Sequence, residues 1–122
     1  MKKVKRNMKS IHKPAVCLDF DGVLNNYHGF DRYDLGEIRP GAEEFIKKLS
    51  RNYNVIIFSV RPFPKIVKWL KRNNLDDYVW DVTSRKPVAL AYIDDRALRF
   101  EGDYKKTLED LKDFKPYWKE EI

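Results

Sequence analysis

Four short runs of mostly apolar residues recur along the chain, and polar stretches separate them. An unbroken apolar run of this length is typical of a strand that is covered on both faces, because a half-exposed strand alternates apolar with polar residues. The third run is the least regular, since Asp81 interrupts it. We therefore predict strands at residues 15–18, 55–58, 78–82 and 90–93.

Between the runs, apolar residues fall at the spacing of one buried helix face. A first helix is predicted to open at Arg39-Pro40-Gly41, with Pro40 in its first turn, and a second to end at Asn73-Asn74. A third is predicted from about Asp103 to Phe114. The residues predicted to face the core are Ala42, Phe45, Ile46 and Leu49 in the first helix, Phe63, Ile66, Val67 and Leu70 in the second, and Tyr104, Leu108 and Leu111 in the third.

The alternation of strands with helices predicts an α/β fold. We expect a single Rossmann-like three-layer domain, in which helices cover both sides of a central, mostly parallel sheet. A chain of 122 residues has the length of one domain. In such folds, ligands bind at the carboxyl ends of the strands.

The positive charge of the chain lies at its N-terminus. The formal charge is +6, and residues 1–13 contain 6 of the 25 basic residues and no acid, so 19 basic and 19 acidic residues remain in 14–122. We expect residues 1–13 to form a flexible basic tail that can contact nucleic acid weakly, and residues 14–122 to form the catalytic domain.

The sequence favours a soluble protein of the cytoplasm. It has no apolar run of about 18 residues and no secretory signal, so no membrane partner is expected. Cys17 is the only cysteine, which is typical of a reducing compartment. The oligomeric state is not predicted by these patterns.

The first predicted strand ends in two carboxylates and a glycine, Asp19-Phe20-Asp21-Gly22. If the chain stays extended, Asp19 and Asp21 point to the same side, because side chains alternate along a strand. Two carboxylates held close together require a cation between them or a proton on one of them. Mg²⁺ prefers oxygen ligands, so a magnesium site is one interpretation and an acidic turn is the other.

Other chemically capable residues also lie at predicted strand ends. Ser59 follows the second strand, and Asp94 and Asp95 follow the fourth. Lys86 lies in the loop before the fourth strand, and Arg61 lies two residues after Ser59. Because these strands are predicted to be parallel, their carboxyl ends should bring the residues to one edge of the sheet.

These residues occur in the order of four motifs, Asp19-Phe20-Asp21-Gly22-Val23-Leu24, Ser59, Lys86-Pro87 and Ile93-Asp94-Asp95, and the chain thereby resembles the haloacid dehalogenase-like (HAD) phosphohydrolases. The resemblance extends from about Ala15 to Phe114. It implies a Mg²⁺-dependent phosphomonoester hydrolase, in which Asp19 is the nucleophile that forms an aspartyl phosphate.

The resemblance also implies a role for each remaining motif residue. Asp21 would protonate the leaving oxygen and then activate water. Mg²⁺ would bind Asp19, the backbone carbonyl of Asp21, and Asp95 or Asp94. Ser59 and Lys86 would bind the phosphoryl group. Gly22 and Arg61 are also expected to contact the phosphorylated substrate, and the alternative for Arg61 is that it caps or anchors the helix that follows it.

The chain has no room for the cap domain that many of these enzymes carry between motifs. An open site favours a bulky or polymeric phosphorylated substrate, such as a nucleic-acid end. A nucleotide or sugar-phosphate phosphatase, a non-catalytic module of phospho-receiver type, and an inactive regulatory HAD domain remain as alternatives. A receiver fits less well, because its paired acids come early and its lysine late.

Overall fold

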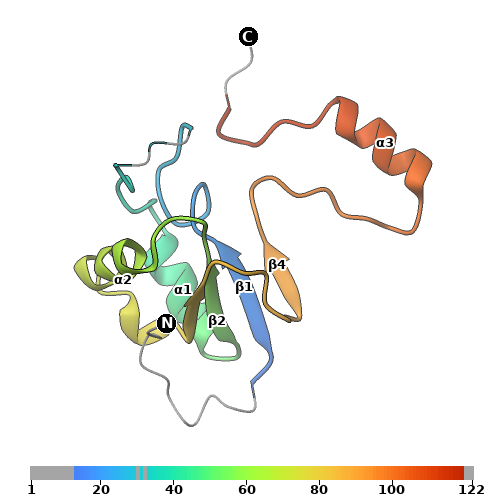
Figure 1. The fold of residues 1–122 in the computed structure, drawn as a ribbon. Helices are drawn as coiled ribbons and strands as arrows, with labels where there is room; N and C mark the ends of the chain where they lie inside the picture. The colour runs from blue at the N-terminus through green and yellow to red at the C-terminus, as the bar shows by residue number, and fades with distance from the viewer. Residues whose placement is uncertain (1–12, 30, 32, 120–122) are drawn as a thin grey trace.

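A computed structural model describes residues 13–29, 31 and 33–119 of the chain (Figure 1). The predictions made for residues 1–12 lie outside this described part. Among the described helices, none has the length and apolar character that a membrane crossing requires. The elements are β1 Ala15–Asp19, α1 Ala42–Ser50, β2 Asn54–Phe58, α2 Phe63–Arg72, a 3₁₀ turn at Asp76–Tyr78, β3 Asp81–Thr83, β4 Ala91–Ile93 and α3 Tyr104–Lys112.

The four strands form one parallel sheet in the order β3-β2-β1-β4. Leu18 in β1 lies in register with Ile57 in β2 and with Ile93 in β4. These side chains belong to the core, against which Ile46 of α1 and Leu70 of α2 are fully buried. The predicted single Rossmann-like α/β domain with a parallel sheet is therefore confirmed.

The opposite face of the sheet is covered by little more than the chain that connects β3 to β4. Cys17, Ile56 and Tyr92 lie in register across this face, where Cys17 and Ile56 are buried and Tyr92 is 43% exposed. The connection, residues 84–90, crosses the face without forming a helix (Figure 1). Only α1 and α2 pack against the sheet in the described chain, so α3 does not form the second helical layer that we expected.

The prediction that α3 buries an apolar face in its own domain is wrong. The side chains of Tyr104, Leu108 and Leu111 are 79%, 64% and 59% exposed, and no residue of the helix is buried. The helix lies away from the sheet (Figure 1). The predicted helix and its apolar spacing are present. Periodicity shows only that one face of a helix is apolar, and it does not identify the surface that covers this face.

Two details of the first helix also differ from the prediction. It begins at Ala42 with Gly41 as its N-cap, so Pro40 precedes the helix. Phe45 is 39% exposed, because the buried stripe of this short helix runs through Ala42 and Ile46 and leaves Phe45 at its edge. The second helix ends at Arg72 with Asn73 as its C-cap, as predicted, and Asn74 then adopts a left-handed conformation with φ 58°.

The segment after β1 folds into a small hairpin. Asn25 and Ile38 form an antiparallel bridge, and the Asn26 N–H donates to the Glu37 carbonyl at 2.8 Å. The indole N–H of Trp69, in α2, donates to the Gly36 carbonyl at 2.8 Å. This hairpin is thereby fixed beside the carboxyl edge of the sheet.

The folded body begins one residue earlier than predicted. The Lys13 ammonium donates to the Ser50 carbonyl at 2.9 Å, and the Lys13 carbonyl accepts from the Asn54 side chain at 3.2 Å. Lys13 therefore belongs to the domain and not to the basic tail.

Candidate functional site: a carboxylate cluster at the edge of the sheet

Three carboxylates meet where β1 and β4 end. Asp19, Asp94 and Asp95 each place one oxygen so that the three atoms lie within 4.8 Å of one another. The two strands are neighbours in the parallel sheet, with Leu18 opposite Ile93, and so their last residues are brought to one edge. The predicted meeting of the first and last motifs is seen here.

The surroundings of Asp19 oppose its ionisation. Partial burial is the largest cause, followed by a side-chain hydrogen bond with Asp95 and by the charges of Asp94, Asp95 and Asp21. Together they raise the pKa of Asp19 from 3.8 to about 8. The cluster without a cation therefore keeps a proton on Asp19 at neutral pH.

Asp95 is the better placed of the two acids that follow β4. Its Oδ2 accepts a hydrogen bond from the indole N–H of Trp118, and its Oδ1 is buried and has no hydrogen-bond donor among the described residues. Asp94 is more exposed, and its Oδ1 accepts the Arg96 backbone N–H at 2.8 Å. A buried carboxylate oxygen without a donor is costly unless a cation or proton reaches it.

This cluster fits a hard divalent cation such as Mg²⁺. Three carboxylates on two strand ends supply oxygen ligands of the kind the ion prefers, and the carboxylate of Asp95 belongs to this group. Asp19, Asp94 and Asp95 are the residues that would hold the ion by their side chains. The carboxylate of Asp21 does not join this group.

Gly22 shapes the site, and its backbone groups are already bonded. Its φ is +83°, and a Cβ at this position would overlap the Asp95 carboxylate. Its N–H donates to the Asn25 side chain at 2.9 Å, and its carbonyl accepts from the Tyr117 hydroxyl. Gly22 thus makes room for Asp95, because a side chain at this position would overlap that carboxylate. The predicted contact of Gly22 with the substrate stays a prediction.

Asp21 turns away from the cluster and forms a buried ion pair. The Arg61 Nε donates to both carboxylate oxygens of Asp21, at 3.0 and 2.9 Å, and Asn25 donates to one of them at 2.9 Å. The chain is no longer extended here, because the Leu24 N–H already bonds the Phe20 carbonyl at 3.0 Å. The expectation that Asp19 and Asp21 point together is therefore wrong.

Arg61 holds the hairpin as well as Asp21. Its side chain is almost fully buried, and its Nη1 donates to the Asp31 carbonyl at 2.8 Å. In the absence of substrate, these contacts hold the guanidinium against Asp21 and the hairpin. The predicted contact of Arg61 with a substrate phosphate stays a prediction. Sequence reasoning did not identify Asn25, whose buried amide contacts both Asp21 and Gly22.

Ser59 and Lys86 lie near the cluster without contacting it directly. Ser59 is buried at the end of β2, and its Oγ accepts the Arg61 backbone N–H at 3.0 Å. The Lys86 ammonium lies 4.5 Å from the centre of the Tyr92 ring. It shares a cavity of about 780 Å³ with Asp19, Asp94 and Tyr92. The structure therefore brings Lys86 into the same cavity as Asp19 without an ion pair between them.

The segment after α3 returns to this site, which the sequence did not predict. Trp118 bonds Asp95, and its ring packs edge-on against Tyr27 with centroids 4.8 Å apart. The Arg96 guanidinium lies 4.9 Å from the Trp118 ring centre. The only sequence signal was a pair of aromatic residues beyond the last helix, and this signal does not indicate a partner.

Comparison with known proteins supports the fold and leaves the function open. No protein-family model matches the chain, and no curated protein matches it. Among solved structures, it resembles a conserved protein coded by a locus of Bacteroides thetaiotaomicron, with a TM-score of 0.57 and 24% identity. That match covers 87% of this chain and 95% of the other. At this identity the likeness concerns the fold alone.

The raised pKa of Asp19 predicts how stability depends on pH in the absence of divalent cations. The folded chain keeps this proton up to about pH 8, whereas the unfolded chain loses it near pH 4. Stability should therefore fall as pH rises from about 4 to 8. Asp19→Asn should stabilise the cation-free protein at pH 8 by about 1–2 kcal/mol. This free energy is smaller than the full pKa shift would give, because the carboxyl is partly exposed and solvent screens its charge. Urea unfolding across this pH range measures both effects, and a wild-type stability that rises over the range would contradict the assignment.

The Asp21–Arg61 pair should behave as a buried ion pair. We expect Arg61→Met to cost about 2–4 kcal/mol, because it leaves the Asp21 carboxylate without its cation. In a double-mutant cycle with Asp21→Asn, the double variant should lose about 1–3 kcal/mol less stability than the sum of the losses of the two single variants. The exposed pair Glu44–Lys48 serves as the control and should show a much smaller coupling. Additive losses for Asp21 and Arg61 would show that the pair is not coupled.

Proposed function

We propose that this protein is a Mg²⁺-dependent phosphomonoester hydrolase that acts through an aspartyl phosphate on Asp19. The observation that carries the proposal is the cluster of Asp19, Asp94 and Asp95, with its unpartnered buried oxygen on Asp95. The resemblance of the four motifs to the HAD phosphohydrolases supports the same reading. Bound Mg²⁺ would neutralise charge on the cluster and on a phosphoryl group.

The covalent step needs Asp19 in its ionised form. Its raised pKa means that this proton must leave before attack, and cationic charge at the cluster favours that loss. An Asp19 oxygen then forms a bond to phosphorus as the ester P–O bond breaks, and the leaving oxygen takes a proton. Water next attacks the phosphorus, loses a proton, and releases inorganic phosphate and the free Asp19 carboxylate.

Asp21 is the group proposed to move the protons. In the structure its carboxylate is paired with Arg61, a partner that suits an ionised base in the second half of the reaction. To donate a proton to the leaving oxygen, Asp21 would have to turn from Arg61 toward Asp19. We propose that Arg61 and Asn25 position Asp21 in the interval between its donation of a proton to the leaving oxygen and its activation of water.

Lys86 and Ser59 are proposed to bind the phosphoryl oxygens. Lys86 lines the cavity beside Asp19, and a compact ammonium can approach a phosphoryl group from there. Ser59 offers a hydroxyl at the end of the neighbouring strand. Neither residue contacts the cluster in the absence of substrate. Their role is proposed because both lie at the same edge of the sheet as the cluster.

We propose a bulky or polymeric phosphorylated substrate, such as a nucleic-acid end. Between Asp21 and Ser59 the described chain forms only the short hairpin, α1 and β2, which leaves no room for a cap. A nucleotide or sugar phosphate remains the smaller alternative. The lone, buried thiol of Cys17 is compatible with the cytoplasm as the proposed compartment.

The test is release of phosphate from a panel of phosphorylated nucleotides, sugars and 3′- or 5′-phosphorylated oligonucleotides, with and without Mg²⁺. Wild-type protein should release phosphate only with the ion, and Asp19→Asn should lower the rate by at least about 10³-fold. Asp113→Asn, which makes the same change at an exposed acid after α3, should leave the rate unchanged. Turnover that survives Asp19→Asn would exclude this residue as the nucleophile.

The panel also separates the alternatives. The best substrate distinguishes a polymer end from a small phosphate ester. A module of receiver type would instead take up phosphate from acetyl phosphate and hold it, without turnover. No release and no uptake under any of these conditions would count against the proposed function.

A further inference from the structure

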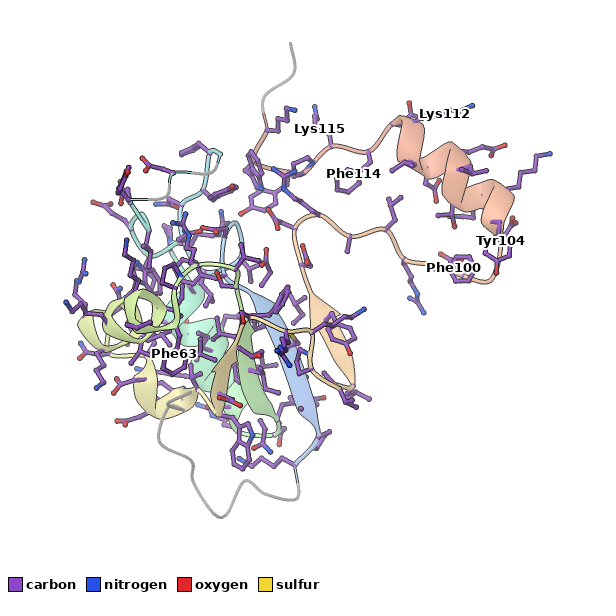
Figure 2. All side chains as sticks on the ribbon, in the orientation of Figure 1. Phe63, Phe100, Tyr104, Lys112, Phe114 and Lys115 are labelled. Carbon is purple, nitrogen blue, oxygen red and sulfur yellow. The ribbon has the colours of Figure 1, made fainter. Side chains whose placement is uncertain are left out.

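The chain returns to the carboxylate cluster after an excursion outside the core of the domain. It leaves the sheet after β4, runs outward to α3 and comes back as residues 113–118 (Figure 1). Figure 2 shows Phe114 and Lys115 on this returning segment. No residue of α3 is buried, so the helix adds nothing to the core. At the end of the returning segment, however, two aromatic side chains contact the candidate site.

Both aromatic side chains donate hydrogen bonds to groups that shape the cluster. The Trp118 indole N–H donates to Asp95 Oδ2, and the Tyr117 hydroxyl donates to the Gly22 carbonyl. The two acceptor residues are themselves neighbours, because a Cβ on Gly22 would overlap the Asp95 carboxylate. The returning segment therefore bonds both sides of one close contact within the site.

Neighbouring side chains hold the two aromatic rings in place. The Trp118 ring packs edge-on against Tyr27 of the hairpin with centroids 4.8 Å apart, and the Arg96 guanidinium lies 4.9 Å from the centre of the Trp118 ring. The Arg39 guanidinium lies 5.0 Å from the centre of the Tyr117 ring. Edge-on aromatic pairs and cation–π contacts are both favourable. The indole N–H is thereby held as a fixed donor beside Asp95.

We propose that Trp118 is a positioning residue for the cation site. Its N–H would hold the Asp95 carboxylate in the orientation in which this group binds the ion together with Asp19 and Asp94. Carboxylates that bind a metal ion are commonly hydrogen-bonded by neighbouring groups, and loss of such a partner typically weakens metal binding about 10–100-fold. The inference rests on the cation site of the proposed function and does not depend on the phosphoryl transfer.

Trp118 is suited to this role because it orients Asp95 without neutralising it. The indole N–H is an uncharged donor, whereas Asp21 is paired with the guanidinium of Arg61. Among the residues that the structure describes, Asp95 forms no ion pair and its buried Oδ1 has no donor. The negative charge of Asp95 therefore remains available to a cation.

The first test is calorimetric titration of the full chain with Mg²⁺ at pH 7. Trp118→Phe keeps an aromatic ring beside Tyr27 but removes the N–H, and it should raise the dissociation constant for Mg²⁺ at least about tenfold. Trp80→Phe is the matched control, because it makes the same change just before β3, at the opposite edge of the sheet from β4. The control should leave the dissociation constant unchanged. Circular dichroism should show that both variants keep the wild-type fold.

A second test asks whether Trp118 acts through Asp95. The same titration is repeated on Asp95→Asn and on the double variant with Trp118→Phe. Because the carboxylate to be oriented is gone, Trp118→Phe should now change the dissociation constant by less than about twofold. If Trp118→Phe merely loosened the whole site, it would weaken binding by the same factor in both backgrounds, and the positioning role would be wrong.

The titrations also distinguish failure of this inference from failure of the proposed function. A wild-type chain that does not bind Mg²⁺ would overturn both. If the wild type binds the ion and Trp118→Phe binds it equally well, the cation site stands and the positioning role is wrong. Tighter binding by Trp118→Phe would show that the indole competes with the ion for Asp95, which also contradicts the role.

Discussion

The repulsion among Asp19, Asp94 and Asp95 is the constraint on which the site depends. Three carboxylates with oxygens within 4.8 Å of one another cannot all remain charged without compensation. In the absence of a cation, the protein compensates with a proton on Asp19 and a donated hydrogen bond from Trp118 to Asp95. The parallel pairing of β1 with β4 imposes this arrangement, because it fixes where the two strands end.

The remaining charges near the site are kept apart by the way the chain turns after β1. Phe20 is buried in the core, and the chain coils immediately after it, so Asp21 is directed toward Arg61 and the hairpin. Among the described residues, the site therefore divides into a carboxylate cluster that forms no ion pair and the acid Asp21, which is paired with Arg61. That division suits two carboxylates with different proposed roles. Asp19 would bind the metal ion and attack phosphorus, and Asp21 would transfer protons.

Most of the sheet could be predicted from the sequence, since each strand is a short apolar run and each run ends in a polar residue that marks the edge. The order of the motifs likewise brought Asp19 together with Asp94 and Asp95. The prediction for Asp21 assumed that the alternation of side chains along a strand continues to this residue. The strand ends at Asp19 and the backbone coils after it, so the assumption does not hold for Asp21. Arg61, Asn25 and Trp118 were missed or misread because their roles come from contacts between distant segments, which local patterns do not contain.

The third helix shows a different limit of sequence reasoning. Its apolar spacing is real, yet the described part of the chain leaves this side of the helix exposed. Hydrophobic periodicity indicates that one face of a helix is apolar, but it does not identify the surface that covers this face. The likeness to the Bacteroides thetaiotaomicron protein concerns the fold and does not identify the partner of this helix.

The most direct test of the carboxylate cluster is calorimetric titration of the purified chain with Mg²⁺ at pH 7, repeated in buffers of different ionisation enthalpy. Because Asp19 holds a proton at this pH, binding of one ion per chain should release close to one proton. Asp95→Asn should weaken binding at least about tenfold, and Asp113→Asn should not. Absence of binding, or binding with no proton release, would contradict the claim that these three carboxylates form a cation site.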